Sequence, residues 1–143
     1  MDRIDGLVVA HTLPGVEAYL ALRQEVGLSG MSVEGAAVGL PRSLFAVTLY
    51  EQELLVGMGR VIGDGGCFFQ VTDIAVKPSY QGRGYGKIIM GEISAFLDTV
   101  PKQAYISLIA DGEAYRLYAQ YGFVPVMPQS QGMFLPRIVP VTG

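Results

Sequence analysis

A glycine-rich segment between an expected strand and an expected helix constrains the fold of this chain most. It reads Gln81-Gly82-Arg83-Gly84-Tyr85-Gly86-Lys87. The strand covers 68–76, and apolar residues recur at helical spacing over 88–100. Because little side-chain bulk crowds the start of that helix, backbone N–H groups can converge on an anion there, helped by the helix dipole. Arg83 and Lys87 are placed to add positive charge, so the pattern predicts a phosphate-binding loop.

Composition narrows the class of protein. The 143 residues predict one domain, 1–143. The net charge is -3 with no basic run, which argues against nucleic acid or an anionic membrane as partner. No apolar run approaches the ~20 residues of a membrane span, and no signal-peptide pattern opens the chain. With one cysteine and one histidine we expect no disulfide framework and no metal site, and a cytoplasmic location.

The order of the expected elements predicts a mixed sheet. Three strands before the glycine-rich segment read as an antiparallel meander. A strand that follows the crossover helix should pair in parallel with the strand at 68–76. The prediction is an α/β (α+β mixed) fold, with a mostly antiparallel central sheet, one parallel pair and helices on both faces. The expected helices are 14–26, 32–38, 84–99 and 111–121, and the expected strands are 43–50, 54–62, 67–76, 104–110, 123–127 and an edge strand at 133–139.

The spacing of the glycines argues against two common phosphate ligands. A Walker A loop needs Ser or Thr after Gly-Lys, whereas Ile88 follows Lys87 here. A dinucleotide loop reads Gly-x-Gly-x-x-Gly after the first strand of a parallel sheet, and this chain has Gly-x-Gly-x-Gly after a meander. A nucleotide-binding fold stays as an alternative, which predicts stabilisation by ATP or NAD and none by coenzyme A.

Two stretches together resemble the GNAT (Gcn5-related N-acetyltransferase) superfamily. One is Asp73-Ile-Ala-Val-Lys-Pro-Ser-Tyr-Gln-Gly-Arg-Gly-Tyr-Gly86, which is similar to the family's acetyl-CoA pyrophosphate loop. The other is Ala114-Tyr-Arg-Leu-Tyr-Ala-Gln-Tyr-Gly-Phe123, which is similar to its second motif. The resemblance covers roughly 42–127. It implies that the strands at 68–76 and 104–110 splay apart to open a V-shaped slot.

The resemblance implies acetyl-CoA as co-substrate. Ala114 would leave room for its thiol arm, and Asp111 stands where the family often has Asn. The backbones of Ile74, Ala75 and Val76 would pair with the pantetheine arm as an added strand does. The pyrophosphate would be held, chiefly through backbone N–H groups, by Gln81, Gly82, Arg83, Gly84, Tyr85, Gly86 and Lys87.

Catalysis by direct attack of an amine on the thioester needs a proton donor, an oxyanion partner and a base. Tyr118 matches the family's tyrosine and is the expected donor to the departing thiolate. A backbone N–H near Ile74 or Ala75, freed by a bulge, is the expected oxyanion partner. Asp73 is a candidate base, or an anchor for a cationic amine. Four further residues are weaker candidates, for which ordinary structural roles are expected: Ser107 in packing, Cys67 as a small buried hydrophobe, His11 at the surface and Arg60 paired with an acid.

The resulting hypothesis is an N-acetyltransferase acting on an amine of a small molecule or peptide. The alternative is a non-catalytic acyl-CoA-binding sensor module of the same fold. The resemblance places the acceptor pocket between residues 27–40 and 125–134, which carry few charges. We therefore expect a compact, partly apolar amine as partner, no nucleic acid and no membrane. A homodimer is a further expectation, since an apolar final strand could serve it.

Overall fold

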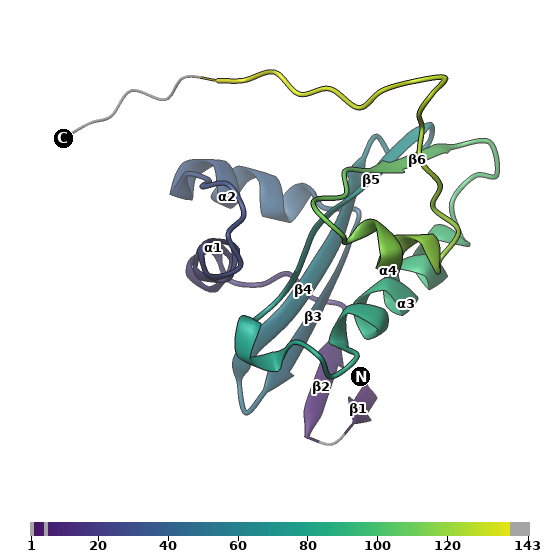
Figure 1. Ribbon diagram of the computed structural model, residues 1–143. Helices are drawn as coiled ribbons and strands as arrows, with labels where there is room; N and C mark the ends of the chain where they lie inside the picture. Colours follow the sequence, from purple (N-terminus) through teal and green to yellow (C-terminus); the bar gives the residue numbers. More distant parts are fainter. Residues whose placement is uncertain (1, 5, 138–143) are drawn as a thin grey trace.

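The computed structural model describes residues 2–4 and 6–137. Among these residues, six strands form one sheet in the order β1-β2-β3-β4-β5-β6 (Figure 1). The strands are β1 (Asp2–Ile4), β2 (Leu7–Ala10), β3 (Phe45–Glu51), β4 (Leu54–Gly63), β5 (Phe68–Val76) and β6 (Tyr105–Leu108). The α-helices are α1 (Val16–Glu25), α2 (Val33–Gly39), α3 (Tyr85–Leu97) and α4 (Tyr115–Ala119), and short 3-10 turns cover Leu40–Arg42 and Pro78–Tyr80.

The strand pairing confirms the predicted mixed sheet. Each pair from β1 to β5 is antiparallel. β5 and β6 are parallel, and α3 lies in the crossover between them. The helix at 32–38 begins as predicted, because the Ser32 side chain accepts a hydrogen bond from the Gly35 N–H at 2.9 Å.

Helices cover both faces of the sheet. Figure 1 shows α1 and α2 against one face and α3 and α4 against the other. The larger core lies under α3, where Ile89 and Ile93 are fully buried. A Cβ on Gly59 of β4 would lie 2.7 Å from atoms of both Ile74 and Ile89. This glycine therefore lets α3 approach the sheet closely beside the functional slot.

The parallel pair separates where the family resemblance predicted a slot. β5 and β6 pair from Phe68 and Tyr105 to Val71 and Leu108, after which β5 runs on alone to Val76. β5 also carries a bulge there: two steps along β4, from Met58 to Arg60, face three steps along β5, from Ala75 to Thr72. The bulge contains Asp73, whose φ is 60°. The extra residue reverses the alternation of side chains for the rest of the strand.

Several predicted elements differ from the structure. The strands β1 and β2 were not predicted. The helix predicted at 111–121 is shorter, because Gly112 has a φ of 54° and the regular helix begins only at Tyr115. The predicted strand at 123–127 is wrong, since Pro125 has no N–H to donate and the Val126 carbonyl accepts from the Ser130 N–H in a turn. The predicted strand at 133–139 is absent over 133–137, and its last two residues lie outside the described part.

Candidate functional site

The glycine-rich loop after β5 presents free backbone donors. Gly82 and Gly84 both have φ of 83°, a left-handed conformation that suits glycine. A Cβ at either position would meet nothing within 4 Å, so the loop opens to solvent. Gly84 caps α3 without a side-chain hydrogen bond. Among the described residues, no hydrogen bond uses a backbone N–H of residues 82–86. The start of α3 is thus a site where several N–H groups can bind an anion.

Side chains around the loop mainly contact neighbouring protein groups and so hold its shape. The Gln81 amide donates to the Val76 carbonyl at 3.0 Å, which ties the loop to the end of β5. The Tyr85 hydroxyl donates to the Glu51 carboxylate, and this hydrogen bond raises the pKa of Tyr85. Arg83 lies 3.6 Å from the same carboxylate and 4.8 Å from the centre of the Tyr80 ring. These contacts leave anion binding mainly to the backbone.

Lys87 connects the loop to the residues after α4 through its backbone carbonyl. Its side chain is exposed, and its carbonyl accepts a hydrogen bond from the Tyr121 hydroxyl at 2.9 Å. Gly86 fits closely, because a Cβ there would lie 3.1 Å from a methyl of Leu117. These two contacts join the start of α3 to α4 and the residues that follow it.

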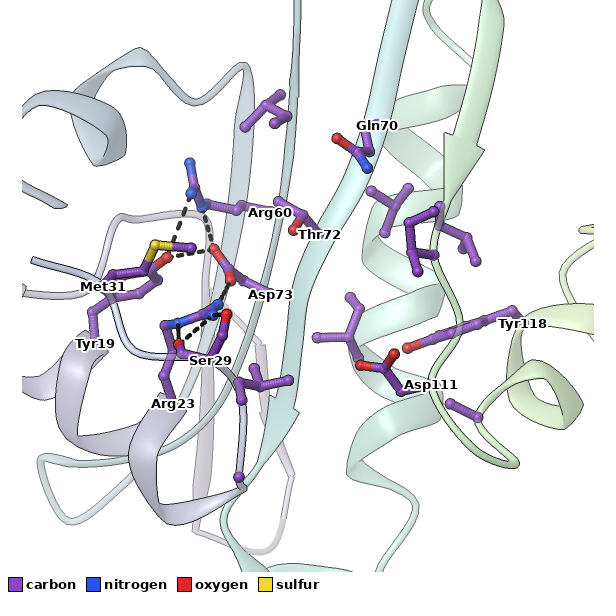
Figure 2. A pocket seen from close by; sticks show the side chains of 18 residues that line it. Tyr19, Arg23, Ser29, Met31, Arg60, Gln70, Thr72, Asp73, Asp111 and Tyr118 are labelled. Atoms are coloured by element: carbon purple, nitrogen blue, oxygen red, sulfur yellow. Dashed lines mark hydrogen bonds and ion pairs between the residues drawn. The ribbon is translucent and has the colours of Figure 1, made fainter. Parts of the chain in front are cut away.

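A cavity of about 550 Å³ lies where β5 and β6 separate. Figure 2 shows its two sides: Tyr19, Arg23, Arg60 and Asp73 lie on one, and Asp111 and Tyr118 on the other. Ile74 also lines the cavity, while Ala75 is buried under α1 and Val76 packs toward the larger core. The complete lining is Tyr19, Arg23, Gly27, Leu28, Ser29, Met31, Arg60, Ile62, Gln70, Val71, Thr72, Asp73, Ile74, Leu108, Ile109, Asp111, Ala114 and Tyr118.

Tyr118 is the buried phenol of this cavity. Its side chain belongs to the core under α3, and Ala114 lies one helical turn earlier at the cavity wall. Burial, and after it the charge of nearby Asp111, raises the pKa of Tyr118. The phenol therefore keeps its proton across the neutral range. Asp111 itself is exposed at the rim.

Asp73 is held by three donors from two directions. The Tyr19 hydroxyl donates to Oδ2 at 2.7 Å, Arg60 Nε donates to the same oxygen at 2.6 Å, and Arg23 Nη1 donates to Oδ1. Only 3% of the Asp73 side chain is exposed. Arg23 is held in turn by Ser29, whose carbonyl accepts from Nη2 at 2.7 Å. The carboxylate is thus the centre of a buried cluster.

This cluster corrects and extends the sequence analysis. Asp73 is buried in an ion-pair cluster, and the expected pairing of Arg60 with an acid is confirmed. Tyr19 and Arg23 were not predicted as site residues. An arginine four residues after a tyrosine on the buried face of an amphipathic helix was the available signal, because a buried arginine needs a carboxylate partner.

The remaining candidates lie outside the cavity lining. Cys67 is exposed, so its expected burial is wrong. His11 is exposed, with Nε2 at 2.5 Å from a Glu92 oxygen. Ser107 faces Gln70 in the β5–β6 ladder. Residues 125–134 do not line this cavity, although 27–31 contribute to it as expected. In the described part of the chain, no group of three or more His, Cys, Asp or Glu side chains could hold a metal ion.

Comparison with known proteins identifies the family. The family model for an acetyltransferase (GNAT) domain matches residues 41–125. A probable acetyltransferase of unknown function from meticillin-resistant Staphylococcus aureus superposes with a TM-score of 0.87 at 47% identity, over 92% of this chain and 99% of that one. A GNAT family acetyltransferase from Streptococcus pneumoniae gives a TM-score of 0.75 at 26% identity, over 92% and 98%.

A curated relative agrees in class. An uncharacterized N-acetyltransferase of Gracilaria tenuistipitata var. liui is 27% identical, over 93% of this chain and 84% of its own length. The splayed parallel pair, the loop before α3 and these matches define an acetyltransferase. The chain belongs to the GNAT family. None of its helices within the described residues is long and apolar enough to cross a membrane.

Proposed function

We propose that this acetyltransferase uses acetyl-CoA and transfers the acetyl group to an amine of a small molecule. The proposal rests on one observation, namely that the same cavity is lined by two features. One is the buried phenol of Tyr118, and the other is the stretch of β5 beyond Val71 that β6 does not pair. The loop of free N–H groups follows that strand after the 3-10 turn at Pro78–Tyr80.

The residues present fit coenzyme A. The N–H groups of residues 82–86 would bind its pyrophosphate, since the loop has open space and no competing acceptor among the described residues. The unpaired edge of β5 over Ile74–Val76 would hold the pantetheine arm by strand addition. The small side chain of Ala114 would leave room beside Tyr118. Acetyl-CoA supplies the acetyl group as an activated thioester.

Tyr118 is the residue that we assign to proton donation. Its raised pKa keeps the phenol protonated at neutral pH, so it can give a proton to the sulfur as the carbon–sulfur bond breaks. The new bond joins the amine nitrogen to the acetyl carbon, and the proton that the nitrogen then loses passes through solvent and restores the phenol of Tyr118. The bulge places an interrupted stretch of ladder at the cavity wall, and an N–H of Ile74 or Ala75 would donate to the acetyl oxygen there.

Asp73 is assigned a positioning role in place of the base considered from sequence. If its carboxylate took a proton from the amine, Arg23 and Arg60 would lose the one negative charge that they share. As an ion pair it instead fixes the two arginines, and with them α1, at the cavity wall. The neutral amine would then come from the acceptor's own acid–base equilibrium with solvent.

The test is thiol release from acetyl-CoA with a panel of primary amines, alongside thermal unfolding with CoA, ATP and NAD. We expect stabilisation by CoA alone and turnover with at least one amine. Stabilisation by CoA without turnover on any amine would favour the sensor alternative. Stabilisation by ATP or NAD in place of CoA would contradict the proposal.

A further inference from the structure

The cluster around Asp73 contains more positive than negative charge. Two guanidinium groups, Arg23 and Arg60, share one carboxylate, and the third partner, Tyr19, is a neutral phenol whose pKa is raised by burial and then by its hydrogen bond to Asp73. One positive charge is therefore left over at a mostly buried place. Such a charge costs free energy unless an anion neutralises it, because the surroundings screen it poorly.

Arg60 is the most exposed of the three charged side chains in the cluster. Its side chain is 16% exposed, against 8% for Arg23 and 3% for Asp73. A guanidinium has five N–H donors. Three are used, by Asp73 at 2.6 Å, by the Ser43 hydroxyl at 3.1 Å and, at a long 3.5 Å, by the Tyr19 hydroxyl. The other two have no partner among the described residues, whereas Arg23 is bound on three sides by Asp73 and Ser29.

Further donors stand beside Arg60 on the same wall. Thr72 is its direct partner across the β4–β5 ladder, and Gln70 lies two residues further along β5. Because side chains alternate along a strand, Gln70 and Thr72 project to the same face. All three side chains line the cavity, and Figure 2 shows Thr72 beside Arg60 and Gln70 further along β5. A hydroxyl, an amide and a guanidinium together form a set of donors suited to a carboxylate.

We propose that the acceptor is a compact amino carboxylate whose carboxylate binds Arg60, with Thr72 and Gln70 beside it, while its amine reaches the side of the cavity near Tyr118. The inference rests on the proposed function and names its substrate class. One surplus charge matches a carboxylate better than a phosphate ester, which carries about -1.5 to -2. This proposal differs from the sequence analysis, which expected an acceptor pocket with few charges. The difference arises because Arg23 and Arg60 lie outside the segments 27–40 and 125–134 that were considered there.

The test compares acceptors that differ only in the anion. An amino acid, its amide, the corresponding decarboxylated amine and an aminoalkyl phosphate of similar length are each assayed with acetyl-CoA. In the wild type we expect the amino acid to have a kcat/KM about 10- to 100-fold above the amide and the amine, the range for one or two charged hydrogen bonds. Equal kcat/KM across the series, or a preference for the phosphate, overturns the proposal.

The variant Arg60→Gln assigns the effect to this side chain. It leaves Asp73 paired with Arg23, so no charge is orphaned and the fold should persist. We expect the KM for the amino acid to rise about 10- to 100-fold, with little change for the decarboxylated amine or for acetyl-CoA. Arg42→Gln, an exposed arginine outside the cavity lining, is the matched control. An equal loss with every acceptor overturns the proposal.

A binding measurement separates this inference from the proposed function. Amino acids are titrated calorimetrically into wild type and Arg60→Gln, each saturated with CoA. If amino acids bind the wild type but not the variant, the carboxylate site is supported, even where no amine turns over. Absence of turnover would then contradict only the proposed acetyl transfer to amines. Turnover of amines with no preference for a carboxylate counts against the site alone. No binding of any amino acid and no turnover overturn both.

Discussion

Arg60 on β4 donates to Asp73 on β5 at 2.6 Å, although the ladder pairs Arg60 with Thr72. The bulge explains this contact. In a regular strand, Thr72 and Asp73 would project to opposite faces, and the carboxylate would enter the apolar core under α3. With one extra residue, both project toward α1. A local irregularity of the backbone therefore assembles a cluster whose members are up to 54 residues apart in the chain.

The first prediction concerns Asp73→Asn. Asparagine tolerates the same positive φ and keeps the volume, so the variant removes mainly the charge. Two buried guanidinium groups then lack a counter-charge, and we expect the free energy of unfolding to fall by about 3–5 kcal/mol. Denaturant unfolding measures this. Arg60→Gln is the matched control and should cost less, because Arg23 still neutralises Asp73.

The same variant tests the positioning role. At a temperature where Asp73→Asn is folded, we expect its pH–rate profile to keep the shape of the wild type, with a lower maximum. A base would instead contribute the acidic limb of that profile. Loss of the acidic limb in the variant would show that Asp73 takes the proton after all.

The second prediction concerns Tyr118→Phe. Loss of the proton donor should lower kcat by about 10²- to 10⁴-fold, while the KM for acetyl-CoA stays close to that of the wild type. Since burial and Asp111 raise the pKa of Tyr118 above its usual 10.0, the donor form persists below the raised pKa. The midpoint of any decline of kcat caused by its ionisation should therefore lie above pH 10, and the variant should lack that decline.

Tyr115→Phe is the control for this experiment. Tyr115 lies on the same helix but is 51% exposed and does not line the cavity. Its loss should leave kcat unchanged. An unchanged kcat in Tyr118→Phe as well would remove the proposed role.

The third prediction concerns the loop glycines. Alanine at Gly82 or Gly84 meets no atom within 4 Å but must adopt φ of 83°, at a cost of about 1–2 kcal/mol. The loop should relax and lose its converging N–H groups, so we expect the Kd for CoA to rise about tenfold in calorimetric titration. Gly65→Ala, with φ of 85° in the β4–β5 hairpin, is the control for strain alone. It should lower the Tm and leave the Kd for CoA unchanged; a similar rise in Kd would argue against the loop.

The fourth prediction concerns Asp64 in the same hairpin. Its carboxylate accepts from the N–H groups of Gly66, Phe68 and Cys67, which lower its pKa from 3.8. A pKa that is lower in the folded than in the unfolded state gives stability above pH 3.8 that is lost as the pH falls through the folded value. Asp64→Ala should therefore have a lower Tm than wild type at pH 7, and the difference should shrink below pH 3.8. Asp64→Asn keeps an acceptor and should lie between them; a pH-independent difference would contradict the assignment.

Local signals were enough for the elements around the loop. Glycine spacing, apolar periodicity and the Ser32 cap depend on residues close in sequence, and they placed α2, α3 and the meander correctly. The parallel pairing of β5 and β6 followed from the need for a crossover. The predicted strand at 123–127 failed because Pro125, whose missing N–H limits strand pairing, stands in its middle.

The cluster at the cavity required information that no local pattern contains. Tyr118 could be proposed from its motif, but its burial against the cavity depends on the packing of α4 on α3. The direction of Asp73 depends on the register between β4 and β5, and its contact with Arg23 joins residues 50 positions apart. A buried arginine on α1 indicates that some carboxylate must face it, without saying which one.

The bulge in β5 also limits how this sheet could be improved. Deleting one residue between Thr72 and Ala75 would restore an unbroken ladder with β4, a change that favours a sheet when judged by its backbone alone. It would also remove the position that turns a carboxylate toward the cavity and leave both arginines without their shared partner. Engineering for greater sheet regularity is therefore opposed at this one residue to both activity and stability, and a screen for thermal stability would retain the bulge.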